Sequence, residues 1–310
     1  MLSIVIVNWN GNSLTQNTIS KLILNERQKN HRYEIIVVDN ASTDNSLELL
    51  KTFGESITLI CSKINLGFAA GCNLGARQAK SELILFLNPD MEVTSHAISE
   101  AVDFMSLPQN LKVGILGIQL LDEHNKITKS SARFPQARMF LAHNLGIDKI
   151  FPILGHNMVE WDHNVTREVD QVIGAFFLTR SDLFKELNGF DEQFFVYFEE
   201  VDYAFRARKI GYKSVYAAHI QAMHQGEGTT SSIKGRRLYY LLRSRLIYGR
   251  KHFTPLANGV NFANTLLLEP IARFIFLISK GDRSQVKDLL QGFTLLYRDL
   301  PNILFRRVKQ

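Results

Sequence analysis

Apolar and polar segments alternate regularly along the first part of the chain. Four runs rich in β-branched residues predict strands: 2–7, 34–38, 57–60 and 83–87. Three segments between them have a helical period: 14–29, 43–53 and 70–80. Strands that alternate with helices indicate βαβ units, so this region predicts a mostly parallel, Rossmann-like sheet with helices on both faces.

The rest of the chain has two different patterns. Shorter strands are expected at Val113–Ile118, Gln171–Thr179 and Ser214–Tyr216, separated by irregular polar loops. After Gly228 the pattern is helical, over 233–252, 257–279 and 283–298. We therefore predict an α/β domain in two halves, 1–110 and 111–228, followed by a C-terminal helical extension over 229–310.

Composition narrows the class of protein. Hydrophobic residues make up 45% and charged residues 21% of the 310 positions, which is typical of a globular protein. The two cysteines lack CxxC spacing, which favours a reducing compartment. Met1–Ser3 leads directly into a strand without a signal-peptide pattern. Polar residues interrupt even the most apolar segment, Phe262–Ile278, so no transmembrane helix is predicted.

The net charge of +6 is uneven, with most of the excess between Lys234 and Lys309. Basic residues among aromatic ones favour an anionic partner: a phosphorylated substrate, a membrane surface or nucleic acid. Nucleic acid is disfavoured, because these residues lie on predicted helices beside apolar ones and no known motif appears. The apolar helices Leu266–Ile278 and Leu289–Leu304 favour either a homodimer interface or peripheral contact with a membrane.

Polar residues follow three of the predicted strands. Open α/β sheets bind ligands at the edge where parallel strands have their carboxyl ends. Asn8-Trp9-Asn10 follows the first strand, Asp39 the second and Asn88-Pro89-Asp90 the fourth. A carboxylate at Asp39 can accept hydrogen bonds from a nucleotide base or ribose, whereas Ser42–Asp44 suits a helix N-cap.

The segment after the third strand has glycines at Gly67, Gly71 and Gly75. Spacing by four predicts close packing of a helix on the sheet. Asn65 and Asn73 add polar groups near the start of that helix, where backbone N–H groups favour a diphosphate. Asn88-Pro89-Asp90 is either a plain turn or a site where Asp90 holds a divalent cation together with phosphate oxygens.

Three acids, Glu199, Glu200 and Asp202, directly follow an aromatic run. They suit the first turn of a helix, where acidic residues complement the helix dipole. The aromatic run before these acids also predicts that they are partly buried. Burial raises the pKa of a carboxylate and makes it a credible general base. His224 stands beside a glycine-containing loop and is either structural or a ligand.

The order of these motifs resembles the family 2 glycosyltransferases. Within them it is most similar to the rhamnosyltransferase-like branch of bacterial surface polysaccharide synthesis. The resemblance covers residues 2 to about 252. It implies a GT-A fold and inverting transfer of a sugar, such as rhamnose, from a dTDP- or UDP-sugar to a glycan or lipid-linked acceptor. It also implies a divalent cation (Mg or Mn) and a cytoplasmic location, peripheral on the inner membrane.

The resemblance also implies roles for individual residues. The nucleotide-sugar site would comprise Asn8, Trp9, Asn10, Asp39, Asn65, Gly67, Asn73, Asn88 and Arg243. Asp90 and His224 would hold the cation. Glu200 matches the acid that acts as base, with Glu199 and Asp202 as alternatives. Two positions depart from the family pattern: Asn88 replaces the first acid of DxD, and Glu200 stands where many relatives have Asp.

Two other functions stay open at this point. A nucleotidyltransferase would need basic residues soon after the first strand, but none occurs before Lys21. A non-catalytic nucleotide-binding protein could share the fold without the chemistry. The transferase hypothesis predicts that Asp39, Asp90, Glu200 and His224 meet around one cleft at the edge of the sheet.

Overall fold

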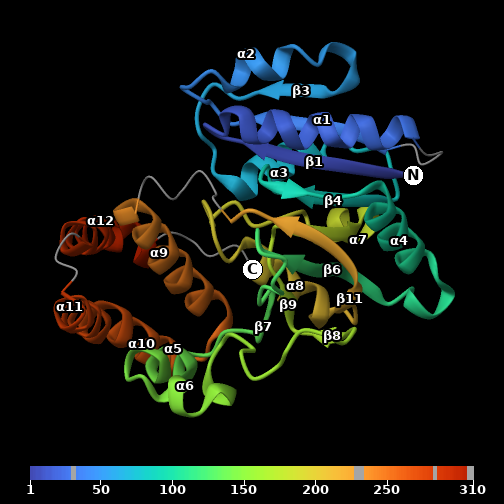
Figure 1. Ribbon diagram of the computed structural model, residues 1–310. Coiled ribbons are helices and arrows are strands. Elements are labelled where there is room, and N and C mark those ends of the chain that lie inside the picture. Colours follow the sequence, from blue (N-terminus) through green and yellow to red (C-terminus); the bar gives the residue numbers. More distant parts are fainter. Residues whose placement is uncertain (29–32, 227–233, 282–284, 306–310) are drawn as a thin grey trace. The chain divides into compact units, whose positions relative to one another are not determined.

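The structure is a computed structural model that describes residues 1–28, 33–226, 234–281 and 285–305 (Figure 1). The chain forms two compact units. The sheet unit comprises Met1–Ala132, Trp161–Glu192 and Glu199–Thr229. The helical unit comprises Arg133–Glu160, Gln193–Phe198 and Thr230–Gln310. The functional boundaries expected near residues 110 and 228 stay a prediction.

A nine-stranded sheet, counted over the described residues, organises the sheet unit (Figure 1). Its order is β3 (Thr58–Cys61), β2 (Tyr33–Asp39), β1 (Leu2–Asn8), β4 (Leu83–Leu87), β10 (Phe176–Arg180), β6 (Val113–Leu121), β11 (Lys213–His224) and β5 (Met91–Glu92), with β8 (Arg167–Val169) also paired to β11. Neighbours β3, β2, β1 and β4 are parallel, whereas β10 runs antiparallel to β4 and β6. The four strands expected at the start of the chain are confirmed.

Two strand predictions need correction. The strand expected over Gln171–Thr179 is two strands, β9 (Gln171–Val172) and β10, and β9 pairs with β7 (Ser131–Ala132) in a separate ribbon. The strand expected at Ser214–Tyr216 extends over all of β11, because a break in register near Ala217 lets its second half pair with β6 again.

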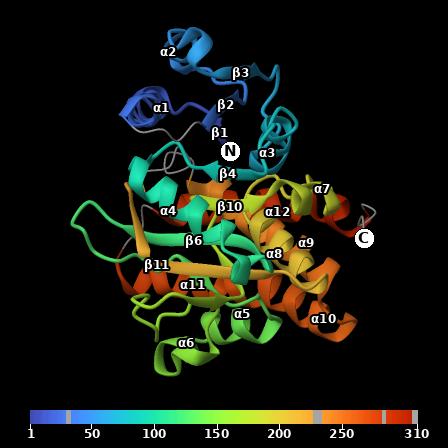
Figure 2. The same cartoon turned by 90° about the vertical axis from the view of Figure 1, so that its right-hand side faces the viewer.

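Helices cover both faces of this sheet (Figure 2). Ile4 and Ile6 of β1 belong to a core that also contains Ile19 of α1 (Asn12–Gln28) and Ala101 of α4 (Ser95–Ser106). Alternate residues point to the opposite face. There α3 (Phe68–Ala76) packs close to β1, since a Cβ on Gly75 would lie 2.5 Å from a methyl of Val5.

An aromatic cluster fills the rest of that second face. Phe86 of β4 has ring centroids 5.1 Å from Phe184 of α7 (Ser181–Glu186) and 4.9 Å from Phe190. Tyr203 of α8 (Glu199–Lys209) lies 5.3 Å from Phe190. The hydrophobic side of α8 is therefore anchored in the core, which fixes the position of its first turn.

The helical unit confirms the C-terminal helices expected from the sequence. It contains α5 (Ala137–Asn144), α6 (Ile147–Ile150), α9 (Lys234–His252), α10 (Pro255–Ala263), α11 (Glu269–Ser279) and α12 (Val286–Phe305). A π-helical segment, η5 (Asn264–Leu268), joins α10 to α11. Other short elements are α2 (Ser46–Lys51) and the 3-10 turns η1 (Gly54–Ser56), η2 (Pro108–Asn110) and η3 (Pro152–Leu154).

Helix Pro255–Ser279, which runs through α10, η5 and α11, is long and apolar enough to cross a membrane. The sequence predicted no such helix, because polar residues interrupt it. Length and composition alone are weak evidence for a crossing, since a helix of a soluble protein can pass the same test.

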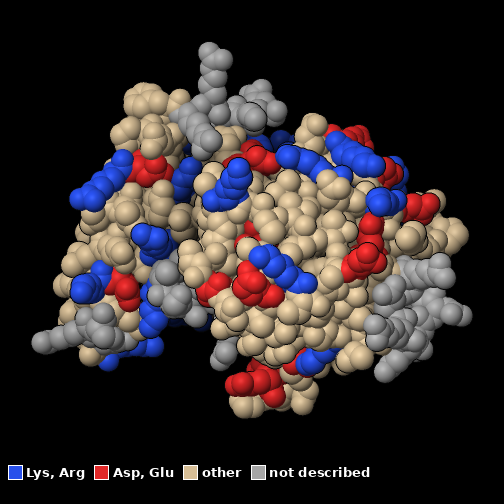
Figure 3. Space-filling view, turned by 90° about the horizontal axis from the view of Figure 1, so that it is seen from above, with Lys and Arg blue, Asp and Glu red and all other residues tan. Residues whose placement is uncertain are grey.

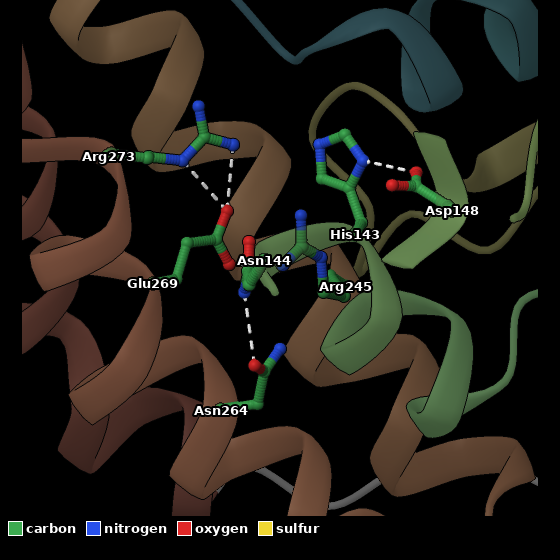
Figure 4. Close-up of polar contacts among 7 residues, drawn as sticks. All are labelled: His143, Asn144, Asp148, Arg245, Asn264, Glu269 and Arg273. Carbon is green, nitrogen blue, oxygen red and sulfur yellow. Dashed lines mark hydrogen bonds and ion pairs between the residues drawn. The ribbon is translucent and has the colours of Figure 1, made fainter. Parts of the chain in front are cut away.

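Buried charge holds this helix inside its unit (Figure 4). Glu269 is fully buried and pairs with Arg245 of α9 and with Arg273, whose Nη2 lies 2.7 Å from Oε1. Burial alone would raise the pKa of Glu269, but the two guanidinium groups hold it below its usual value. Beside this network, Asn144 of α5 donates a hydrogen bond to Asn264 over 3.0 Å.

Glu269→Ala is expected to lower the free energy of unfolding by about 3–5 kcal/mol, because it leaves buried guanidinium charge without its carboxylate. Denaturant titration followed by far-UV circular dichroism measures the change. Arg298→Ala, which removes an exposed charge from α12 of the same unit, is the matched control and should be nearly neutral. Equal stability of the two variants would contradict the role given to this network.

Gly75→Ala is expected to destabilise the chain by about 1–3 kcal/mol, since the new methyl group would collide with β1. Gly259→Ala on α10 should instead be neutral or stabilising by up to about 1 kcal/mol, because a Cβ there meets nothing within 4 Å. Melting temperatures of the two variants and the wild type test this contrast. A Gly75 variant as stable as the wild type would show that α3 can move away from the sheet.

Candidate functional site

The carboxyl ends of β1 and β2 lie opposite each other, with Asn8 in register with Asp39. Both side chains are buried, and Asn8 Nδ2 donates to Asp39 Oδ1 over 2.8 Å. Asn8 Oδ1 accepts a hydrogen bond from Thr15 at 2.6 Å. Asp39 Oδ2 accepts one from the backbone N–H of Ser42 at 3.2 Å. The structure thus holds the Asp39 carboxylate rigidly at the edge of the sheet.

Ser42 has a different role from the expected helix cap. Its hydroxyl accepts hydrogen bonds from the Asn10 backbone N–H and from Asn8, both at 3.0 Å. Helix α2 starts later, after Asn45, which makes no side-chain capping bond. Asn10 accepts in turn from the Thr43 backbone N–H at 2.7 Å. The cap prediction is wrong for Ser42, because the loop after β1 competes for its hydroxyl.

Asn40 organises the loop that leads into α3. Its Nδ2 donates to Asn65 Oδ1 and to the Gly67 carbonyl, each at 3.1 Å, and its Oδ1 accepts from the Leu66 backbone N–H at 2.9 Å. Asn65 Oδ1 also accepts from the Gly67 backbone N–H at 2.9 Å. These bonds hold the start of α3 beside the end of β2. The sequence placed Asn40 directly after Asp39 at the end of the second strand but assigned it no role of its own.

Asn73 of α3 clamps a distant loop. Its Oδ1 accepts from the Phe190 backbone N–H at 2.9 Å, and its Nδ2 donates to the Phe190 carbonyl at 2.8 Å and to Glu192 at 3.0 Å. Gly189 has a positive φ of 72°, and a Cβ there would lie 2.5 Å from Asn73 Oδ1. The amide of Asn73 is therefore engaged in positioning the chain that approaches the acidic cluster.

Asp90 and His224, both expected to bind a cation, are neighbours. His224 ends β11, and its Nε2 lies 3.3 Å from Asp90 Oδ2. Asp90 is buried, and its Oδ1 has no hydrogen-bond partner among the described residues. A buried carboxylate oxygen without a donor is costly, so this atom suits a cation or a bound water.

These two side chains fit a cation that is held mainly by its substrate. Within the described part of the chain, no group of three or more His, Cys, Asp or Glu residues could hold a metal ion. One carboxylate and one imidazole are too few for an all-protein site. They suit Mg²⁺ or Mn²⁺ that takes its other ligands from diphosphate oxygens and water. Asn88 lies two residues before Asp90 and is half-buried, and its side-chain amide adds no charge to the site.

A small cavity of about 180 Å³ lies beside Asp90. Residues of α1 line it, including Thr18 and Lys21, together with Pro89 and Gln225. Sites that enclose small ligands usually measure about 300–1,000 Å³. This cavity is therefore too small to enclose a nucleotide sugar.

Two glutamates begin α8 in a poorly hydrated environment. Glu199 is buried, and its Oε2 has no hydrogen-bond partner among the described residues. Burial and the adjacent Glu200 carboxylate raise the pKa of Glu199 well above its usual value. Burial, followed by the charges of Glu199 and Glu200, likewise raises the pKa of the Cys72 thiol. The two acids therefore lie close to α3, and Glu200 is the more exposed of them.

The backbone before this pair is strained. Tyr197 and Phe198 both have positive φ, 68° and 72°, which is unfavourable for bulky residues. Phe198 packs against Phe140 and Tyr248, with ring centroids 6.5 Å and 5.5 Å apart. Adjacent strained residues are concentrated at functional sites.

Asp202 differs from the other two acids. Its carboxylate is fully buried and accepts a hydrogen bond from Arg206 Nε at 2.7 Å. Arg206 also donates to the carbonyls of Leu187 and Gly189 at 2.7 and 2.8 Å. Asp202 thus ties α8 to the loop before it, so its carboxylate is occupied and Glu199 and Glu200 are better placed to act as base.

Arg243, expected to touch phosphate, belongs to the helical unit. Its Nε donates to Asp299 of α12 at 2.9 Å, and its Nη1 donates to the Gln193 carbonyl at 2.8 Å. Both contacts lie within that unit, so they give Arg243 a structural role there. A phosphate contact from Arg243 stays a prediction.

The structure brings the predicted residues together in three groups. Asn8, Trp9, Asn10 and Asp39 surround the ends of β1 and β2, with Trp9 partly exposed. Asp90 lies beside His224, and Glu199 and Glu200 lie beside Cys72. That all three groups meet over one ligand stays a prediction.

Charged side chains are mixed over the face shown in Figure 3. Lysines and arginines alternate there with aspartates and glutamates, and uncharged areas lie between them. This face therefore lacks the continuous basic surface that binds a nucleic-acid backbone.

Solved glycosyltransferase structures share this fold. The mannosyltransferase PcManGT from Pyrobaculum calidifontis, in complex with GDP-Man and Mn²⁺, aligns over 97% of this chain and 87% of its own, with a TM-score of 0.57 and 15% identity. S. aureus TarS 1–349 in complex with UDP-GlcNAc aligns over 99% and 93%, with a TM-score of 0.53 and 14% identity. The fold expectation is confirmed: this is a GT-A-type α/β fold with a helical extension.

Sequence relatives are also transferases. The low-salt glycan biosynthesis hexosyltransferase Agl10 of Haloferax volcanii is 24% identical over 272 residues, which are 86% of this chain and 81% of the relative. The rhamnosyltransferase WbbL of Escherichia coli K12 is 26% identical over 244 residues, 74% of this chain and 87% of the relative. The N-acetylglucosaminyl-diphospho-decaprenol L-rhamnosyltransferase of Mycobacterium tuberculosis is 24% identical over 215 residues, 63% and 67% of the two chains.

A protein-family model also matches the part of the chain that contains the motifs at the ends of the strands. The model of glycosyl transferase family 2 matches residues 3–159, just over half of the chain. That range includes β1, Asp39, the α3 segment and Asp90. The chain therefore belongs to glycosyl transferase family 2, in the neighbourhood of the rhamnosyltransferases and hexosyltransferases.

Proposed function

We propose that this chain is an inverting glycosyltransferase that moves a hexose, such as rhamnose, from a nucleotide-diphosphate sugar to the hydroxyl of a glycan or lipid-linked acceptor. The observation that carries this proposal is the pair Glu199–Glu200 at the start of α8, in a chain that belongs to a glycosyltransferase family. A carboxylate in such surroundings is basic enough to take a proton from an alcohol as it attacks.

The donor nucleotide would lie along the carboxyl ends of β1 and β2. Asp39 is held there as an acceptor for ribose hydroxyls or a base N–H, and the ordered loop from Asn65 to Gly67 would line the phosphates. Helix α3 begins in this loop, and its unpaired backbone N–H groups favour negative charge. The solved neighbours named above contain GDP-Man and UDP-GlcNAc, which supports a nucleotide-sugar donor such as dTDP- or UDP-sugar here.

Transfer would proceed as a single displacement. Glu200, the more exposed acid, would accept the proton of the acceptor hydroxyl while that oxygen forms a bond to the anomeric carbon. The bond from that carbon to the diphosphate oxygen breaks at the same time, on the opposite face of the sugar. The raised pKa of buried Glu199 favours its protonated form, which reduces repulsion between the two carboxyl groups.

Asp90 and His224 are the side chains that would hold a divalent cation. A bound Mg²⁺ or Mn²⁺ would neutralise the charge that grows on the leaving diphosphate. We place the reaction in the cytoplasm, where nucleotide sugars are available, at the face of a membrane that carries the acceptor. A homodimer formed by the helical unit is the alternative use of its apolar helices.

Glu200→Gln is expected to reduce the turnover number by about 10²–10⁴-fold while nucleotide binding stays intact, because the amide cannot accept the proton. Release of nucleotide diphosphate measures turnover, and calorimetry measures binding. Glu199→Gln is the matched comparison and should keep more activity than Glu200→Gln. Full transfer by the Glu200 variant would exclude it as the base, and loss confined to the Glu199 variant would move the role to its neighbour.

Asp90→Ala is expected to abolish the gain in affinity for a nucleoside diphosphate that Mn²⁺ gives the wild type. Isothermal titration with Mn²⁺, and again with a chelator, measures that gain. Asp103→Ala removes an exposed acid from α4 and serves as control. An unchanged Mn²⁺ effect in the Asp90 variant would remove this residue from the cation site.

A panel of nucleotide sugars tests the reaction class itself. Binding followed by slow release of nucleotide diphosphate is expected from a glycosyltransferase, since water replaces the acceptor at a low rate. Binding of a sugar nucleotide with no release, even with acceptors present, would favour a non-catalytic binding protein. Formation of a nucleotide sugar from a nucleoside triphosphate and a sugar phosphate would favour a nucleotidyltransferase.

A further inference from the structure

Helix Pro255–Ser279 of the helical unit has an inverted distribution of side chains. Its buried residues are all polar: Asn261, Asn264, Thr265 and Glu269. Eight of its large apolar side chains are exposed instead, and the other four are half-buried: Leu256, Val260, Leu267, Ile271, Phe274, Ile275, Phe276 and Ile278 are exposed, and Phe262, Leu266, Leu268 and Leu277 are half-buried. A helix on the surface of a soluble domain normally turns its apolar side to the core. This helix does the opposite.

Partners inside the unit engage Glu269 and Asn264 on the buried polar side (Figure 4), whereas Thr265 Oγ1 has no hydrogen-bond partner among the described residues. Glu269 pairs with Arg245 and Arg273, and Asn264 accepts a hydrogen bond from Asn144. Arg245 also stacks over the ring of Phe140, with its guanidinium carbon 4.4 Å from the centroid. Helices in contact with lipid have this arrangement, because polar groups pair inside the protein and apolar groups face outward.

A second exposed apolar segment lies next to this helix in the same unit. Ile147, Ile150, Phe151 and Ile153 of α6 and η3 are all exposed. Lys149 between them lies over the ring of Phe276 in α11, 5.3 Å from its centroid. Figures 1 and 2 both show α5 and α6 alongside α10 and α11. The two segments therefore form one surface, here called the outer face.

Positive charge borders the outer face. Lys280 also lies over the ring of Phe276, at 4.7 Å, so two ammonium groups flank one exposed aromatic ring. Aromatic and aliphatic side chains beside lysines are typical of helices that lie in the interface of a bilayer with anionic lipids.

We propose that the outer face binds an anionic lipid bilayer, with helix Pro255–Ser279 lying in the plane of the interface. The helix lies flat because its polar side packs along α5 and α9 of its own unit and cannot leave them to cross the bilayer. Apolar side chains such as Ile271 and Ile275 enter the acyl region, while Lys149 and Lys280 contact headgroup phosphates. This inference rests on the proposed function in placing the reaction at a membrane, but vesicle binding is measured without donor or acceptor and can fail or succeed separately from transfer.

Sedimentation of the full chain with vesicles tests the proposal. The wild type is expected to bind vesicles of phosphatidylcholine mixed with phosphatidylglycerol more tightly than vesicles of pure phosphatidylcholine. Lys149→Gln with Lys280→Gln should weaken binding to the anionic vesicles about 30-fold, at roughly 1 kcal/mol per lysine. Ile271→Gln with Ile275→Gln should weaken binding to both kinds at least about tenfold, because 58% and 61% of these side chains is exposed.

Leu111→Gln with Val165→Gln is the matched control. These side chains, 62% and 57% exposed, lie in the sheet unit, and their replacement should leave vesicle binding unchanged. Circular dichroism checks that every variant is folded. A folded wild type that binds neither kind of vesicle would overturn the proposal, as would outer-face variants that bind like the control. A wild-type dimer that the isoleucine variants dissociate, without vesicle binding, would assign the outer face to a second copy of the chain and also overturn it.

Discussion

Parallel pairing of β2, β1 and β4 is the constraint on which the rest of the candidate site depends. Parallel strands end at one edge, so the residues that follow each apolar run are brought together although they are distant in the chain. Asn8 and Asp39 stand in register for this reason. The pairing survives only while both faces of the sheet are covered, which requires α3 to lie as close to β1 as Gly75 allows. The position of the nucleotide-sugar residues is therefore a consequence of packing on the opposite side of each strand.

Much of this arrangement could be predicted from the sequence, and the exceptions have physical causes. Continuous β-branched runs identified the first four strands, because a buried parallel strand has no polar alternation to obscure it. Helix α4 was missed, although its buried residues Ile98, Ala101 and Met105 recur at helical spacing. The sequence could have excluded Asp202 as a candidate base, because Arg206 follows it by one helical turn and suits an ion pair with it. The clamp between Asn73 and Phe190 could not be predicted from the sequence, since 117 residues separate its partners.

The helical extension shows a different limit of sequence reasoning. Polar residues in helix Pro255–Ser279 argued against a transmembrane helix when they were read along the chain, and left peripheral membrane contact open. In three dimensions Asn261, Thr265 and Glu269 recur every four residues on one side, which is buried within the unit. Hydropathy averaged along a sequence loses this directional information. The pairing of Glu269 with Arg245 of α9 became visible only in the structure.

The two cysteines differ in a way that has a practical consequence. Cys72 is buried on α3, and its raised pKa keeps it protonated and slow to react with alkylating reagents. Cys61 is exposed at the end of β3, in register with Asp39 of the neighbouring strand. A maleimide dye should therefore label the native chain at one position without any engineering. If a nucleotide binds at Asp39 as proposed, the emission of the dye would report on its binding, in an assay that needs neither acceptor nor turnover.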